Sequence, residues 1–240
     1  MTGGGRGIGL AIARLWAERG VAVAVVDREP SGEAAARDVC RGVPFAFFAA
    51  DVRDAARARE IVADVAARLG PIDFLVLNAG ITRDRVSWRM TDEEWDEVIG
   101  VNVKGAFNYA RAAAPAMRER RAGAIVFISS INGLRGKFGQ SNYAASKAAM
   151  VGLARSLALE LGSSGITVNV VAPGMVRTKM SAGLPVEVVE RARSESALKR
   201  LAEPEDVAAA VAFLCGPDAR RITGVVLRVD GGQALAAESA

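Results

Sequence analysis

Histidine is absent from this chain of 240 residues, and several other residue types are scarce. The absence of histidine excludes Ser-His-Asp triads, histidine general bases and histidine metal ligands. The two cysteines, Cys40 and Cys215, lie in apolar stretches without metal-site spacing, so we expect buried thiols and no metal. Only five of the 31 basic residues are lysines. The scattered arginines form no basic run interleaved with aromatics, which gives nucleic-acid binding little support.

Long hydrophobic runs are missing as well. No stretch approaches the roughly 18 consecutive apolar residues of a membrane span, and no charged segment followed by an apolar one marks a signal peptide. We therefore expect a cytoplasmic protein without a membrane partner. Apolar residues make up 51% of the chain, which is enough for one large core. We expect a single domain over residues 1–240.

Short apolar runs rich in β-branched residues alternate with longer helical patterns along the whole chain. The expected strands are Val21–Val26, Val43–Ala49, Ile72–Leu77, Ala124–Ser129, Ile166–Val171 and Gly224–Val229. The expected helices are Leu10–Arg19, Ala55–Leu69, Asp92–Arg118, Tyr143–Leu161 and Pro204–Leu214. This alternation predicts an α/β protein with a doubly wound, Rossmann-type parallel sheet that helices cover on both faces.

The first strand of such a sheet is missing from the pattern. A glycine-rich loop begins at Thr2, and no apolar run precedes it. A parallel sheet without an interior strand leaves a slot whose edges carry unpaired N–H and C=O groups, which is energetically costly. We therefore expect the sheet to lack its first strand.

The glycine-rich loop, Thr2–Gly9, has the composition of a dinucleotide-binding turn. Glycines allow a tight turn and a close approach of backbone N–H groups to a pyrophosphate, and the following helix adds its positive N-terminal dipole. Asp27, after the next strand, lies near the offset of an acid that binds a ribose 2′-hydroxyl. Each feature alone has a plainer explanation, namely an ordinary turn and a solvent-exposed loop acid.

Two further polar loops follow expected strands. Asp51-Val52 comes after the second strand, and Asn78-Ala79-Gly80 comes after the third. Ligands of open α/β sheets bind at the carboxyl ends of the strands, which is where these loops are expected. Helix capping explains such polar residues equally well when each is taken alone.

A tyrosine and a lysine, Tyr143 and Lys147, lie four residues apart at the start of an expected helix. This spacing places the phenol and the ammonium on one face of the helix. A nearby cation favours the phenolate, so we expect the lysine to lower the tyrosine pKa and to make it a proton donor and acceptor for a carbonyl or alcohol. Ser130, at a strand end, is placed to hold the same substrate oxygen by a hydrogen bond. Taken alone, a tyrosine and a lysine at this spacing are more often an exposed pair on a helix, and a serine after a strand is more often an ordinary loop residue. The occurrence of all three after a dinucleotide-binding loop favours a catalytic role.

Taken together, these features resemble those of the short-chain dehydrogenase/reductase family over essentially the whole chain. The matching elements are Thr2–Gly9, Asn78-Ala79-Gly80, Asn102, Ser130, Tyr143 with Lys147, and Pro173-Gly174. The resemblance implies that Ser130, Tyr143 and Lys147 are catalytic, and that Asn102 supports a proton relay through water. It also implies that Ser130, Gln140 and Tyr143 contact the substrate.

The same resemblance implies a set of residues that bind the dinucleotide. Lys147 would hold the nicotinamide ribose, Asp51 and Val52 would flank the adenine, and Val176 and Thr178 would lie at the carboxamide. The full implied set is Gly3, Gly5, Arg6, Gly7, Ile8, Gly9, Asp27, Arg28, Asp51, Val52, Asn78, Ala79, Gly80, Tyr143, Lys147, Pro173, Gly174, Val176 and Thr178.

Within the family, the chain is most similar to 3-oxoacyl-(acyl-carrier-protein) reductases and acetoacetyl-CoA reductases. The similarity rests mainly on Ala79–Asp84, Phe138-Gly139-Gln140, Leu198-Lys199-Arg200 and Asp230-Gly231-Gly232. It implies hydride transfer between nicotinamide and a 3-oxoacyl or 3-hydroxyacyl thioester, in fatty acid metabolism. Two alternatives remain: an NAD-dependent dehydrogenase of another small alcohol, sugar or steroid, and a dinucleotide-binding module without catalysis.

Cofactor choice and assembly are further expectations. Asp27 repels a 2′-phosphate and accepts from a 2′-hydroxyl, which favours NAD(H), whereas Arg6 and Arg28 would attract the phosphate of NADP(H). We give Asp27 more weight and expect NAD(H). The resemblance also implies a homotetramer built on the helices near Val101–Arg118 and Tyr143–Leu161.

The start of the chain carries a last expectation. Relatives usually read apolar-apolar-Val-Thr-Gly at the end of their first strand, and Met1 stands at the valine position here. A GTG valine codon also serves as a bacterial start codon. We therefore expect the natural protein to carry an upstream segment that includes the first strand.

Overall fold

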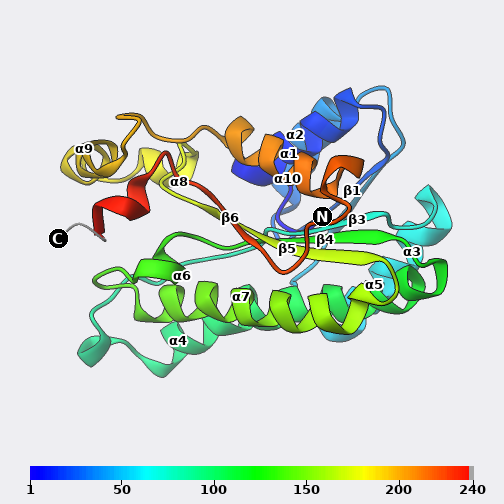
Figure 1. The fold of residues 1–240 in the computed structure, drawn as a ribbon, viewed down its shortest axis with the longest axis horizontal. Helices are drawn as coiled ribbons and strands as arrows, with labels where there is room; N and C mark the ends of the chain where they lie inside the picture. The colour runs from blue at the N-terminus through cyan, green and yellow to red at the C-terminus, as the bar shows by residue number, and fades with distance from the viewer. Residues whose placement is uncertain (238–240) are drawn as a thin grey trace.

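The computed structural model describes residues 1–237, without the side chains of residues 179, 180 and 237, and it shows a parallel sheet between two layers of helices (Figure 1). Its strands are β1 Val23–Asp27, β2 Phe45–Ala49, β3 Phe74–Leu77, β4 Gly123–Ile128, β5 Ile166–Pro173 and β6 Val226–Val229. All six expected strands are therefore present, with ends that differ from the predicted ends by at most two residues.

Helices fill the connections between the strands. They are α1 Gly7–Glu18, α2 Glu33–Val39, α3 Ala55–Leu69, α4 Asp92–Ile99, α5 Gly105–Arg120, α6 Asn132–Arg135, α7 Ser141–Gly162, α8 Lys179–Ala182, α9 Val186–Glu195 and α10 Pro204–Cys215. In Figure 1, α1, α2 and α10 lie above the sheet, and α3, α5 and α7 lie below it. Each layer encloses its own hydrophobic cluster against one face of the sheet.

The strands pair in parallel, as the alternation predicts. One group has the order β3-β4-β5-β6, and the other contains β1 and β2. In the first group, β4 pairs with β5 from Gly123 opposite Ile166 to Ile128 opposite Val171. Five of the six residues of β4 are buried, because helices cover both faces of the sheet.

Thr2 connects the two groups of strands. It forms isolated parallel bridges with Val26 of β1 and with Leu77 of β3. The Thr2 N–H donates to the Val76 carbonyl at 3.0 Å, and the Val26 N–H donates to the Met1 carbonyl at 2.9 Å. Among residues 1–237, no regular strand lies between β1 and β3, so the expected gap in the sheet is confirmed.

The structure corrects the prediction of one α-helix over Asp92–Arg118. The run is continuous, but a π-helical segment, Gly100–Lys104, separates α4 from α5. The sequence patterns also missed the helices α2 and α9, and one physical reason explains both omissions. Each buries a single residue, Ala36 in α2 and Ala192 in α9, so neither carries an apolar stripe. Within the described residues, we find no helix that is both long and apolar enough to cross a bilayer.

Candidate active site

The predicted functional residues gather at the carboxyl edge of the sheet. Asp27 ends β1, Asp51 and Asn78 follow β2 and β3, and Ser130 and Gly174 follow β4 and β5. Parallel strands bring these loops to one edge although they are far apart in sequence. The fold therefore forms one site from segments that span most of the chain.

Ser130, Tyr143 and Lys147 meet where β4 ends beside the start of α7. The Ser130 side chain lies beside the Tyr143 phenol and lowers its pKa. The Lys147 Nζ lies 5.6 Å from the centroid of the Tyr143 ring, as the four-residue spacing requires. The Ser129 hydroxyl donates to the Lys147 carbonyl at 2.7 Å and attaches the end of β4 to the helix.

Lys147 is held as a buried cation. Only 3% of its surface is exposed, and its Nζ donates to the Ile128 carbonyl at 2.8 Å. Burial lowers the pKa of Lys147 to about 8. Gly80 leaves the room that the ammonium occupies, because a Cβ at Gly80 would lie 3.2 Å from Nζ. The ammonium therefore has a fixed position beside the phenol.

The expected direction of the Tyr143 pKa is wrong in this structure. Burial raises the pKa of Tyr143, and the charge of Asp84 raises it further, while the Ser130 side chain lowers it. Lys147 lies against the ring and bonds to the Ile128 carbonyl, and its presence does not reverse the effect of burial on the Tyr143 pKa. Tyr143 is consequently a protonated phenol at neutral pH, which is the form that a reduction needs.

Asn102 lies in the π-helical segment and is completely buried. Its Oδ1 accepts from the Ile81 N–H at 2.8 Å, and its Nδ2 donates to the Ile81 carbonyl at 3.0 Å and to the Ser146 hydroxyl at 2.9 Å. Ser146 donates in turn to the Tyr143 carbonyl at 2.7 Å. The asparagine is thus linked to α7 and to the loop after β3.

The glycine loop packs so closely that side chains are excluded. A Cβ on Gly9 would lie 2.0 Å from the Gly3 carbonyl oxygen, and Gly3 itself has a φ of +67°. The Asn78 side chain donates to the Gly3 carbonyl at 2.7 Å and holds the loop against the end of β3. Among the described residues, no side chain caps the N-terminus of α1, so its amides remain available to an anion. The loop therefore fits a dinucleotide pyrophosphate.

Asp27 lies directly against the glycine loop. Its Oδ2 accepts from the Gly5 N–H at 2.9 Å, and its Oδ1 accepts from the Glu29 N–H at 3.1 Å. Arg28, the neighbouring cation, pairs with Glu29 at 3.1 Å on an exposed surface. The arrangement fits a ribose at the end of β1, with a carboxylate facing it.

The other predicted cofactor residues occupy different surroundings. Asp51 pairs with Arg53 at 2.6 Å, which lowers the pKa of Asp51, and Val52 is buried beneath α5. Thr178 lies over the glycine loop, with its Cγ2 3.5 Å from where a Cβ on Gly7 would be. Ile8, in the first turn of α1, is half-buried and packs against the hydrophobic cluster that this helix covers.

Gln140, which the resemblance predicts to contact the substrate, belongs to a polar network. Its Nε2 donates to Asp84 Oδ2 at 2.8 Å, and its Oε1 accepts from Asn132 Nδ2 at 2.9 Å. The Asn132 backbone N–H donates to the Ser130 hydroxyl oxygen at 3.1 Å. A hollow of about 250 Å³ adjoins this network, and the exposed Trp88 and Phe138 line it.

The comparisons with known proteins agree with this geometry. A family profile described as Enoyl-(Acyl carrier protein) reductase matches residues 3–234. The chain belongs to the short-chain dehydrogenase/reductase family. It is 42% identical over 235 residues to the 3-oxoacyl-[acyl-carrier-protein] reductase FabG of Staphylococcus aureus, which covers 97% of this chain and 96% of the relative. It is 44% identical over 237 residues to the acetoacetyl-CoA reductase of Rhizobium meliloti, covering 98% of each.

A solved structure shows the same fold. Levodione reductase superposes with a TM-score of 0.92 at 34% identity, over 98% of this chain and 96% of that one. This short-chain dehydrogenase/reductase is therefore an oxidoreductase of carbonyl and hydroxyl groups that uses a nicotinamide cofactor. The catalytic and binding roles of the individual residues stay predictions.

Three residues near the site were not identified from the sequence. Ser146 lies inside the Tyr143–Lys147 segment, three residues after the tyrosine, and its place on the same helix face was an available signal. Asp84 and Asn132 carry no such local signal. Their contacts with Gln140 join segments that are 56 and 8 residues away in the chain.

Proposed function

We propose that this protein reduces the 3-keto group of a 3-oxoacyl thioester to a 3-hydroxyl, and that it uses NADH in preference to NADPH. The observation that carries the proposal is the arrangement of the buried Ser130 and Lys147 around the half-buried Tyr143, with Asn102 linked to the same helix. The named relatives, a 3-oxoacyl-[acyl-carrier-protein] reductase and an acetoacetyl-CoA reductase, support this substrate class.

Each residue has a distinct task in this proposal. When bound, the nicotinamide supplies the hydride. The Ser130 hydroxyl holds the substrate carbonyl oxygen, and the Tyr143 Oη donates its proton to that oxygen as the alcohol forms. The Lys147 ammonium stabilises the phenolate that remains. Asn102 holds the loop after β3 against the start of α7 through its hydrogen bonds with Ile81 and Ser146.

The surface beside Tyr143 suits an acyl chain and its carrier arm. Trp88 is 74% exposed and Phe138 is 83% exposed, and both line the hollow next to the helix that carries Tyr143. Covering exposed aromatic side chains of this size with an apolar group lowers the free energy, so binding of an acyl chain here is favourable. Lys137 lines the same hollow and adds a positive charge for the phosphates of a carrier.

The position of Asp27 supports the preference for NAD(H). Its carboxylate touches the Gly5 amide, so a 2′-phosphate at this ribose would meet a negative charge. Arg28 is engaged with Glu29, which reduces its attraction for that phosphate. Asp27 therefore decides the preference.

A homotetramer and a cytoplasmic location complete the proposal. The exposed face of α7 carries Ala145, Ala148, Ala149, Gly152 and Leu159, and small residues allow two helices to approach closely. Leu159 is 86% exposed and Phe107 of α5 is 38% exposed, which supports burial of these faces by another copy. Cys40 and Cys215 are buried free thiols, which suits a reducing compartment.

A panel of substrates tests the proposal. Acetoacetyl-CoA, a trans-2-enoyl-CoA, a small ketone, a sugar alcohol and a steroid alcohol are assayed with NAD(H) and NADP(H). We expect the highest kcat/KM for acetoacetyl-CoA with NADH. A higher kcat/KM for the enoyl thioester or for an alcohol would contradict the proposed substrate and identify that compound as the better one. Dinucleotide binding without turnover of any substrate would favour the non-catalytic module.

A further inference from the structure

Asn108, near the start of α5, is a buried polar residue that the proposed mechanism does not use. Only 2% of its surface is exposed. Its Nδ2 donates to the Val52 carbonyl at 3.0 Å and to the Arg53 carbonyl at 3.2 Å. Both acceptors belong to the backbone of the loop after β2. One side-chain amide of α5 therefore holds two consecutive peptide groups of a loop that is predicted to flank the adenine.

The peptide groups that Asn108 holds also fix Asp51. The peptide group with the Val52 carbonyl contains the Arg53 N–H, which donates to Asp51 Oδ1 at 2.9 Å. The next peptide group, with the Arg53 carbonyl, contains the Asp54 N–H, which donates to the Asp51 carbonyl at 3.1 Å. Because a peptide group is planar, a hydrogen bond that fixes its C=O also fixes the direction of its N–H. Asn108 therefore orients the side chain and the main chain of Asp51 through two peptide groups.

The carboxylate of Asp51 is accessible to a ligand, since its side chain is 31% exposed. The hydrogen bond with the Arg53 side chain lowers the pKa of Asp51, burial raises it, and the Arg53 N–H lowers it further. The group is therefore ionised at neutral pH, and an ionised carboxylate only accepts hydrogen bonds, such as those from the exocyclic amino group of adenine. The loop is also joined to the expected ribose site, because the Ala50 N–H donates to the Asp27 carbonyl at 3.0 Å.

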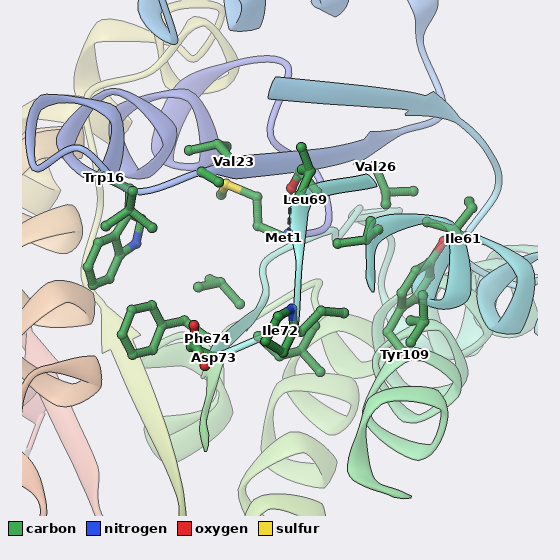
Figure 2. A pocket seen from close by; sticks show the side chains of 18 of the residues that line it. Met1, Trp16, Val23, Val26, Ile61, Leu69, Ile72, Asp73, Phe74 and Tyr109 are labelled. Atoms are coloured by element: carbon green, nitrogen blue, oxygen red, sulfur yellow. Dashed lines mark hydrogen bonds between the residues drawn. The ribbon is translucent and has the colours of Figure 1, made fainter. Parts of the chain in front are cut away.

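A packed contact adds to the hydrogen bonds between α5 and this loop. Gly105, the first residue of α5, lies against the Val52 side chain, because a Cβ at Gly105 would lie 2.5 Å from Val52 Cγ2. Tyr109, the residue after Asn108, is buried in the same hydrophobic cluster as Ile61 of α3. Figure 2 shows Tyr109 and Ile61 together in the wall of a mainly apolar cavity of about 170 Å³. Asn108 therefore projects from a helix that the core holds in place.

The same helical run holds the other end of the expected dinucleotide site. Asn102, in the π-helical segment before α5, bonds to Ile81 and to Ser146 of α7. Two buried asparagines of one continuous run thus tie it to the helix that carries Tyr143 and to the loop after β2.

We propose that Asn108 is a positioning residue for the adenosine half of the dinucleotide, because it fixes the loop after β2 so that the Asp51 carboxylate meets the adenine. The inference rests on one part of the proposed function, the adenine contact of Asp51 and Val52, and it is independent of the substrate. Carbonyl groups inside a protein require a hydrogen-bond donor, so the loop moves when the amide is removed. Affinity for the adenosine half then falls, whereas the catalytic residues of α7 keep their positions.

Three variants of the full chain test the proposal. Asn108→Leu removes the amide and keeps a side chain of similar size. Asn108→Ser keeps one hydroxyl donor and is the milder change, for use if the leucine variant does not fold. Asn169→Leu is the matched control, because Asn169 of β5 is also completely buried and its Nδ2 donates to the Ile222 carbonyl at 2.8 Å.

Calorimetry measures the dissociation constants of NADH and of ADP-ribose, which carries the adenosine half without the nicotinamide. We expect Asn108→Leu to raise both by the same factor of about ten or more, which corresponds to the loss of one hydrogen bond to a charged group. Asn108→Ser should give a smaller change in the same direction. The control should lower the melting temperature without raising the dissociation constant of ADP-ribose. An unchanged ADP-ribose affinity in Asn108→Leu, or an equal loss in the control, would overturn the proposal.

Kinetics with the best substrate of the panel separate the two halves of the cofactor. In Asn108→Leu, kcat at saturating NADH should stay within about twofold of the unmodified protein, while the KM for NADH rises. Reduced nicotinamide mononucleotide lacks the adenosine half, so kcat/KM with this compound should not change. A loss with the mononucleotide as large as the loss with NADH would contradict the proposal.

A double-mutant cycle distinguishes positioning from general destabilisation. Asp51→Ala alone should weaken ADP-ribose binding, and Asn108→Leu should add little in that background if it acts through Asp51. Additive effects would overturn the proposal, as would an unmodified protein that does not bind ADP-ribose. A protein that shows the predicted pattern of ADP-ribose binding but reduces no 3-oxoacyl thioester would retain this inference and refute the proposed function.

Discussion

Replacing Gly9 by alanine should impair dinucleotide binding and lower stability together. The added Cβ would lie 2.0 Å from the Gly3 carbonyl oxygen and 2.8 Å from Asn78 Nδ2. Ordinary contacts of this kind need more than about 3.4 Å, so the glycine loop must move by more than about 1 Å. Overpacking of this kind costs roughly 1–3 kcal/mol. In a chain of this size, each kcal/mol of lost stability lowers the melting temperature by about 2–4 °C. The expected loss is therefore roughly 2–12 °C.

Calorimetry and dinucleotide titration measure the two effects of the Gly9→Ala substitution. We expect a dissociation constant at least about tenfold higher than that of the unmodified protein, because the displaced loop carries the amides that face the pyrophosphate. Gly162→Ala is the matched control, since a Cβ at the end of α7 meets no atom within 4 Å. The control should leave both quantities almost unchanged. A Gly9→Ala protein with normal melting and normal affinity would refute the proposed packing of the loop.

Four further predictions follow from the site. Tyr143→Phe should lower kcat by roughly 10²–10⁴-fold with dinucleotide affinity kept, and near-normal turnover would contradict its role as proton donor. Asp27→Ala should raise kcat/KM with NADPH relative to NADH, and an unchanged ratio would show that Asp27 does not face the ribose. Light scattering should give a tetramer that Leu159→Glu disrupts, whereas a stable monomer of the unmodified protein would refute the assembly. Burial lowers the pKa of Lys147 from 10.5 to about 8, so the unfolded chain binds more protons between these values. Stability should therefore rise with pH across that window more steeply than in Lys147→Met, and equal slopes would contradict the burial.

Most of the fold could be predicted because its strands are buried on both faces. A continuous apolar run such as that of β4 predicts a strand that is buried on both faces. The i, i+4 spacing of Tyr143 and Lys147 likewise predicts that the two side chains share one helix face. The gap in the sheet was also predictable, because the glycine loop begins at Thr2. These features depend on local sequence alone.

The features that sequence could not predict depend on tertiary contacts. The π-helical segment that carries Asn102 is a change in backbone hydrogen bonding within an otherwise continuous helical pattern. The raised pKa of Tyr143 follows from burial and from Asp84, which is distant in sequence. The helix α9 has mostly exposed side chains, so no periodic apolar stripe marked it.

The fate of the transferred hydride tests the central claim most directly. Acetoacetyl-CoA is reduced with NADH that carries deuterium at the transferring position of the nicotinamide, and mass spectrometry locates the label in the product. The proposed site predicts one deuterium on carbon 3 of a 3-hydroxybutyryl thioester, and almost none with Tyr143→Phe. An unlabelled product, or a failure to reduce the ketone when a trans-2-enoyl thioester is reduced instead, would contradict it.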